Sequence, residues 1–219
     1  MLLACLTLLH IFVLVFWVGG DLGAYYASYA VADPNQPPAA RRLAARMISN
    51  IDMAPRTSLV LALPTGLTLA VAKGWLDLGG VWLVVAWGAG LVWLAVVWAV
   101  HLREPKPGSL LPRTDLGLRL VAIAGFTLTG MAAVAGQIAV PAFIGLKLIL
   151  LAVAITCGLI IRRVLPPFAT AFTKVLNDPA DAQAQAIVAG LLAEVRRYVI
   201  GIWLAVSLAG LIGLWQPVF

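Results

Sequence analysis

The sequence predicts an all-α, polytopic membrane protein with six transmembrane helices in a single domain, residues 1–219. Three observations support this fold class. The 219 residues are 63% hydrophobic and 11% charged, with a mean hydropathy of +1.01, whereas a soluble domain is roughly half apolar and a quarter charged. Six apolar stretches are each long enough to cross a bilayer, which takes about 20 helical residues. Lysine and arginine gather in alternate connectors between those stretches.

The six expected spans follow one another along the chain and are separated by polar, proline or glycine residues. They cover residues 2–28, 54–73, 80–101, 117–138, 142–163 and 197–216. The first apolar run is longer than the short core of a secretory signal and has no basic start. We therefore expect it to be a retained helix.

The connectors alternate between strongly basic and nearly uncharged. The three long connectors hold the basic residues Arg41, Arg42, Arg46, Arg103, Lys106, Arg113, Arg162, Arg163, Lys174, Arg196 and Arg197. The second and third spans are joined through Lys73 and Asp77 only, and the connector after the fourth span has no charge. Basic loops stay in the cytoplasm. Both termini are therefore expected outside, in the periplasm, and the protein in a bacterial inner (plasma) membrane as a multi-pass protein.

The long cytoplasmic connectors are expected to be partly helical and to lie at the membrane interface. Residues 33–38 combine aspartate, asparagine and three prolines, which predicts a turn. Residues 39–53 then form a short basic helix that leads into the second span. Asp178 with Pro179 predicts the N-cap of a helix that runs almost unbroken into the last span.

The charge and the cysteines argue against nucleic-acid binding and against a cysteine-based metal site or disulfide framework. The net charge of +6 comes from residues beside the span ends, so no solvated basic face for nucleic acid is expected. Cys5 and Cys157 both fall within apolar spans and have neither the spacing of metal ligands nor that of a disulfide framework.

Two ionisable residues lie inside apolar spans and are the main candidates for chemistry. His10 lies in the first span and Lys147 in the fifth, and both spans run inward from the outer face. At 1.5 Å per residue, both should lie roughly 8–12 Å below the outer ends of their helices. A neutral imidazole can ligate haem iron, zinc or copper. A buried lysine can act as acid or base, or pair with a carboxylate. The structural alternative is that His10 forms a hydrogen bond with a neighbouring carbonyl group, and that the Lys147 side chain extends to the membrane interface.

A second polar layer is expected near the cytoplasmic ends of the spans. It holds Asp21, Asp52, Arg56, His101 and Arg119. We expect Asp21 and Arg56 to form an ion pair that holds two helices in register. His101 stands where a helix stops and is typical of an interfacial cap. If His10 and His101 are both ligands, two haems are required, because the two residues lie at opposite depths.

Small and aromatic residues complete the candidate cofactor contacts. Gly19 and Gly20 form a small-residue face that suits close helix packing or a flat ligand. Trp87, Trp93 and Trp98 are placed either to line a tetrapyrrole or to face lipid. Thr65-Gly66 and Thr129-Gly130 occur at similar depth in two spans, which is more typical of small-residue helix contacts than of a duplication.

These residues resemble a group of membrane families. His10 followed by Trp17-Val18-Gly19-Gly20 resembles the first helix of the HemJ-type protoporphyrinogen oxidases, and Gly145-Leu146-Lys147-Leu148 resembles their lysine-bearing helix. The helix framework is also similar to the copper-resistance protein D family. About the first half of the chain resembles a family of predicted membrane proteins without an assigned function, through His10, Asp52, Thr65-Gly66-Leu67 and Trp82-Leu83.

The resemblance implies a protein that binds haem b (protohaem IX) and has a redox role, either porphyrin oxidation or electron transfer to the membrane quinone pool. It implies His10 as the metal ligand and Lys147 as the catalytic or carboxylate-orienting group, and we add His101, Gly19, Gly20 and Arg56 as candidate cofactor contacts. The lipid bilayer is the expected partner, with a porphyrin or quinone, and a second copy or a partner subunit, as further candidates.

Two alternatives stay open. One is a transporter for copper or another small solute, against which the four methionines are scattered along the chain. The other is a non-catalytic membrane subunit of a larger complex.

Overall fold

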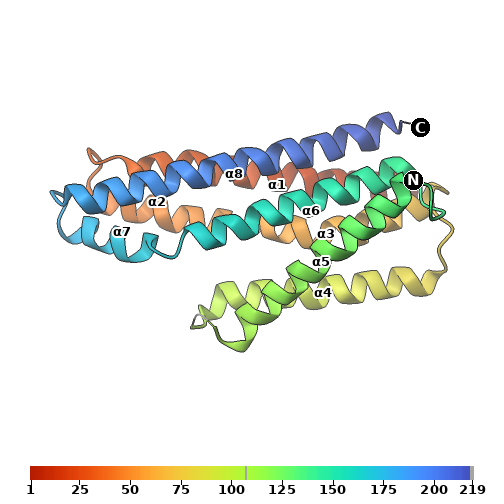
Figure 1. Ribbon diagram of the computed structural model, residues 1–219, viewed down its shortest axis with the longest axis horizontal. Helices are drawn as coiled ribbons and strands as arrows, with labels where there is room; N and C mark the ends of the chain where they lie inside the picture. The colour runs from red at the N-terminus through yellow and green to blue at the C-terminus, as the bar shows by residue number, and fades with distance from the viewer. Residues whose placement is uncertain (107, 218–219) are drawn as a thin grey trace.

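The computed structural model describes residues 1–106 and 108–217, and all of its regular structure is α-helical (Figure 1). The helices of this part are α1 (Leu2–Ala32), α2 (Pro38–Ile51), α3 (Met53–Ala72), α4 (Gly80–Arg103), α5 (Leu110–Val134), α6 (Ala142–Val164), α7 (Phe168–Asn177) and α8 (Ala182–Trp215). Six stretches are long and apolar enough to cross a membrane, with α2 and α3 counted as one. The all-α, six-span fold class is therefore confirmed.

The six long helices form a closed ring in the order α1, α3, α4, α5, α6, α8, with α8 packed back against α1. The chain starts and ends at one end of this ring, together with the α3–α4 and α5–α6 connections (Figure 1). We call this the terminal end. The opposite end, which carries α2, α7 and the α4–α5 connection, is the connector end. Both termini lie at one end, as the sequence predicts.

The interior of the ring is filled by apolar side chains from all six helices. Its buried members are Trp17, Leu59, Ala154, Ile155, Ile202, Ala205 and Val206. Small residues bring the helices close where they cross. A Cβ added at Gly130 of α5 would lie 2.6 Å from the carbonyl oxygen of Gly145 in α6. Gly130 therefore serves close helix packing, which is the role expected for the second Thr-Gly pair.

The connector end has a core of its own. The ends of α1 and α8 pack there against α2 and α7 around the buried residues Val31, Ala44, Ala171, Phe172, Val175, Ala184, Val188 and Leu192. Because α1 has 31 residues and α8 has 34, they are about 46 and 51 Å long. The hydrocarbon core of a bilayer is about 30 Å thick. α1 and α8 are therefore longer than a membrane span requires, and the extra length forms the connector bundle with α2 and α7 (Figure 1).

An arginine holds the connector bundle together. Arg41 is 1% exposed, and its Nε donates a hydrogen bond to the carbonyl oxygen of Val31 over 2.8 Å. The turn over residues 33–38 and the short helix α2 agree with the sequence prediction. The sequence predicts that α2 and α7 lie at the membrane interface. In the structure the two helices also pack against each other and against the long helices, around a common apolar core.

Two helix starts differ from the prediction. α5 runs from Leu110 to Val134 instead of over 117–138. Its early start is possible because Asp115 pairs with Arg119 and Arg162, so this charge does not exclude the first turns from the bundle. α8 begins at Ala182, and its N-cap is Asp181, whose carboxylate accepts a hydrogen bond from the backbone N–H of Ala184 over 2.9 Å. The predicted N-cap Asp178 instead ends α7, and its carboxylate accepts from the N–H of Ala180 in the turn.

Candidate functional site

His10 is held by a hydrogen bond that determines which ring nitrogen carries the proton. Nδ1 of His10 lies 2.9 Å from Oγ1 of Thr65 in α3. The hydroxyl of Thr65 has one proton, and it donates that proton to the carbonyl oxygen of Leu61 over 2.6 Å. Oγ1 is therefore the acceptor toward His10, and Nδ1–H is the donor. The neutral imidazole then keeps the lone pair of its Nε2 for a metal ion or another donor.

Gly66 makes room for the imidazole. A Cβ added at Gly66 would lie 3.0 Å from Cε1 of His10 and 3.5 Å from its Nε2. The ring of His10 thus packs directly against the backbone of α3. Thr65 orients this ring and Gly66 accommodates it, so the Thr-Gly pair of α3 has a role that the pair in α5 lacks.

Lys147 lies in a cleared space against α8. A Cβ added at Gly213 would lie 2.5 Å from Nζ of Lys147, so the amine lies directly against α8 at this glycine, and a larger residue there would make the flexible lysine side chain shift. Within the described residues, Lys147 has no ion-pair partner. An anionic ligand that binds there would therefore meet the lysine amine without competition from a carboxylate of the described residues.

A helix contact places His10 and Lys147 at the same level. A Cβ added at Gly210 of α8 would lie 3.0 Å from Leu14 of α1. The two helices are antiparallel, so His10 and Gly213 both lie one turn from that contact toward the terminal end. Lys147 is at the level of Gly213. The structure thus brings the two residues to one depth on helices that both pack against α8.

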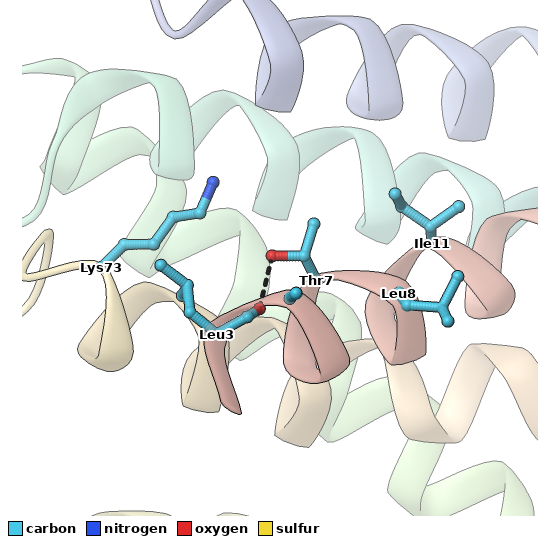
Figure 2. Close-up of a pocket in the computed structure, with 6 residues that line it drawn as sticks. Leu3, Thr7, Leu8, Ile11 and Lys73 are labelled. Carbon is cyan, nitrogen blue, oxygen red and sulfur yellow. Dashed lines mark hydrogen bonds between the residues drawn. The ribbon is translucent and has the colours of Figure 1, made fainter. Parts of the chain in front are cut away.

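A shallow hollow lies on the outer surface of α1 at the terminal end, and His10 is not among the residues that line it. Its volume is about 460 Å³, and it is lined by Leu3, Ala4, Thr7, Leu8, Ile11 and Lys73. Figure 2 shows the Lys73 side chain extending beside Leu3, with the Thr7 hydroxyl turned back to its own helix. The ammonium of Lys73 lies 4.6 Å from the centroid of the Trp75 ring. This lining suits an apolar body with an anionic group at its end.

The charged layer at the connector end is paired differently from the prediction. Arg56 forms an ion pair with Asp52, four residues before it, and not with Asp21. This correction has a simple geometric reason, because residues four apart on one helix face are neighbours. Arg56 is thus engaged by a carboxylate of its own segment, and its predicted role as a cofactor contact stays a prediction.

Asp115 is the centre of a buried network that sequence reasoning missed. Its side chain is 1% exposed and accepts from Arg119 over 3.1 Å, from Arg162 over 2.6 Å and from the indole N–H of Trp93 over 3.0 Å. The network joins α4, α5 and α6 at the connector end. The sequence signal for it is the spacing of four between Asp115 and Arg119, which places the two side chains on one helix face.

The remaining candidates lie away from His10. His101 is in the last turn of α4, at the connector end, and its ring lies 6.2 Å from that of Trp98. Because His10 is at the terminal end, the two histidines cannot ligate one iron. Gly20 packs against Pro55 of α3, where a Cβ would come within 2.6 Å, whereas Gly19 has nothing within 4 Å. Gly20 is therefore a helix contact, and only Gly19 has open space beside it.

Trp87, Trp93 and Trp98, three of the four tryptophans of α4, hold it to its neighbours in the ring. The indole N–H groups of Trp87 and Trp98 donate to Thr68 and Thr57 of α3, over 2.9 and 3.2 Å. Trp93 donates to Asp115 of α5, as described above. The indole N–H of each of these three tryptophans thus donates to a neighbouring helix. The sequence predicts that these side chains line a tetrapyrrole or face lipid, and neither prediction included this structural role.

Among the residues that the structure describes, no three His, Cys, Asp or Glu side chains gather in the manner of a metal site. Comparison of the chain with protein-family models, with curated proteins and with solved structures gives no match.

Proposed function

We propose that this protein is a haem b-binding integral membrane protein with a redox role, in which Nε2 of His10 is an axial ligand of the haem iron. The observation that carries the proposal is the hydrogen bond from Nδ1–H of His10 to Thr65. Histidines that ligate metals almost always donate their other ring N–H to a neighbouring acceptor, which sets the tautomer and the ring orientation.

The donor set at the terminal end fits a haem. A neutral imidazole is the commonest protein ligand of haem iron, and His10 presents one from a helix face that Gly66 keeps clear. Lys147 at the same depth and Lys73 beside the hollow supply positive charge for the carboxylates of a haem or of a porphyrin substrate. A bound haem supplies reversible one-electron transfer. The resemblance of the first and fifth spans to the porphyrin-oxidising family supports the same assignment.

Lys147 is the residue that we propose to act on the substrate. Its ammonium has space against Gly213 and no ion pair within the described part of the chain. It can hold a porphyrin carboxylate in place, or give and take a proton at a reacting porphyrin or quinone. Quinone-linked electron transfer and porphyrin oxidation both make use of such a group.

The charge distribution supports an orientation for this site. Most of the basic residues lie at the connector end, so we propose that this end faces the cytoplasm of a bacterial inner membrane. His10 and Lys147 would then lie in the outer half of the bilayer. Copper transport is less well supported, because the four methionines are scattered along the chain and, within the described residues, no three His, Cys, Asp or Glu side chains gather as metal ligands.

The test is a visible spectrum of the purified protein, reduced by dithionite minus oxidised, with pyridine haemochrome quantitation. We expect the α and β bands of a b-type cytochrome at stoichiometric haem. His10→Ala is expected to lose the haem. His101→Ala, which changes a histidine of α4 at the connector end, is the matched control and should retain it.

Two results contradict the proposal. Wild-type protein that is produced with ample haem and still shows no haem bands excludes the cofactor. Full haem retention by His10→Ala excludes the ligand. In either case, copper found by metal analysis of the same preparation supports the transporter alternative. Co-purification of a stoichiometric partner protein supports the subunit alternative.

A further inference from the structure

A buried carboxyl group at the connector end has no partner for its charge. Asp21 of α1 is 7% exposed, and its Oδ2 is buried without a hydrogen-bond partner within the described residues. It lies where α1 and α3 are in close contact, since the neighbouring Gly20 packs directly against Ala54 and Pro55. Asp21 is not used by the site at the terminal end, because the ring core around Trp17 lies between them.

The charged groups around Asp21 do not compensate a carboxylate. Arg56, at the start of α3, is engaged by Asp52. Asp52 is itself close enough to Asp21 for the two charges to act on each other. From α8, Arg196 donates to Ser28 over 3.0 Å and stacks on Tyr29, about two helical turns farther along α1.

A neutral donor faces the same place. Trp203 of α8 packs against Tyr25, with ring centroids 5.1 Å apart, one turn along α1 from Asp21. The indole Nε1 of Trp203 is also buried without a hydrogen-bond partner in the part of the chain that the structure describes. The indole N–H of Trp203 is close enough to act on the Asp21 carboxyl group, so a donor on α8 and an acceptor on α1 face each other between the two helices without a completed hydrogen bond.

Asp115 shows how this protein accommodates a carboxylate that must stay ionised. It is as buried as Asp21, but two arginines and one indole N–H bond to it. An ionised carboxylate in an apolar interior without such partners costs several kcal/mol. The difference between the two aspartates is therefore a difference in the charge that the fold can hold at each position.

We propose that Asp21 is a proton-binding site, and that it holds its proton at neutral pH. Binding a proton removes the uncompensated charge and the repulsion with Asp52. The side chain of Asp52 is 31% exposed, so it gives the proton a path to water at the connector end. This proposal concerns a different site from that of His10 and does not depend on haem.

The first test is infrared spectroscopy of the full-length protein in detergent at neutral pH. The wild type is expected to show the C=O band of a protonated carboxylic acid, shifted in D2O. Asp21→Asn should remove the band. The matched control is Asp77→Asn, which changes an exposed aspartate at the terminal end and should leave the band unchanged. A wild type without the band, or an Asp21→Asn protein that keeps it, overturns the proposal.

The second test needs no variant, so it is independent of whether Asp21→Asn folds. Dicyclohexylcarbodiimide is apolar and reacts with carboxylic acids that carry a proton. Peptide mass spectrometry of the treated wild type is expected to find the adduct on Asp21 and not on Asp115, with labelling that decreases as the pH rises. Labelling of Asp115 in preference to Asp21, or no labelling of Asp21 at any pH, contradicts the proposal.

Discussion

Thr65 in α3 accepts a hydrogen bond from Nδ1–H of His10 in α1 over 2.9 Å, because its own hydroxyl proton is donated to the carbonyl oxygen of Leu61. This relationship joins two residues that are 55 positions apart in the sequence. It fixes the proton of the imidazole on Nδ1, so the lone pair is on Nε2, which points away from Thr65. Most of the predictions about the terminal end depend on it.

Replacing Thr65 by valine removes the acceptor while keeping the shape of the side chain. We expect Thr65→Val to weaken haem binding by about 10- to 100-fold, which is the usual effect of losing a group that orients a metal ligand. Thr65→Ser keeps the hydroxyl and should bind haem nearly as the wild type does. Haem titration followed by absorbance measures the difference. Equal affinity of the valine and serine variants would show that the hydrogen bond does not orient His10.

Gly66 is expected to tolerate no side chain. Gly66→Ala places a Cβ 3.0 Å from Cε1 of His10, so the ring must move and haem occupancy should fall. Gly19→Ala is the matched control, because nothing lies within 4 Å of its added Cβ. It removes a glycine from a helix interior, which stabilises a helix by about 1 kcal/mol. Haem content per polypeptide is the measurement, and equal haem content in the two variants would contradict the packing argument.

Lys147 is expected to recognise a carboxylate. Lys147→Gln should weaken binding of dicarboxylate haem by about 10- to 100-fold, since hydrogen bonds to charged groups contribute about 1.5–3 kcal/mol. Binding of the haem dimethyl ester should be the same in the wild type and in Lys147→Gln, because the ester lacks the negative charges. Lys73→Gln, tested in parallel, separates the contributions of the two lysines. If Lys147→Gln weakens the ester and the acid equally, the lysine has a structural role instead.

Asp115 is expected to matter more for stability than Asp52 does. Asp115→Ala leaves Arg119 buried without its partner, and breaking a buried ion pair from one side costs about 3–5 kcal/mol. Asp52→Ala breaks a pair whose side chains are 31% and 33% exposed, and such pairs contribute about 1 kcal/mol or less. Thermal unfolding in detergent should therefore show a much lower midpoint for Asp115→Ala. Similar midpoints would show that the Asp115 network does not hold α5 and α6 together.

The sequence predicted five of the six spans closely, and the exception is instructive. α5 begins at Leu110, seven residues before the expected 117. Residues 110–116 were left out of the expected span because Arg113 and Asp115 lower the hydropathy of that segment. In the folded bundle Asp115 pairs with Arg119 and Arg162, so this carboxylate is buried and the segment is helical despite its composition.

The candidate site was predicted only in part for a similar reason. His10 and Lys147 were identified because ionisable residues are rare in apolar spans. Thr65, Gly66 and Gly213 were not assigned to them, because small and hydroxyl-bearing residues are common in membrane helices. The Thr65-Gly66 pair was visible as a motif, but the same motif in α5 serves helix packing.

By itself, the sequence determined the fold class, the number of spans, the position of both termini at one end, and the depth of His10 and Lys147. All of these depend on hydropathy and on a rise of 1.5 Å per residue, which accumulate along the chain and need no knowledge of neighbouring helices. Only the tertiary structure decided that Thr65 orients His10, that Gly213 clears a space for Lys147, and that Arg56 pairs with Asp52 and leaves Asp21 alone. Those relationships depend on how each helix is rotated about its axis, and this rotation is set by the packing of its neighbours.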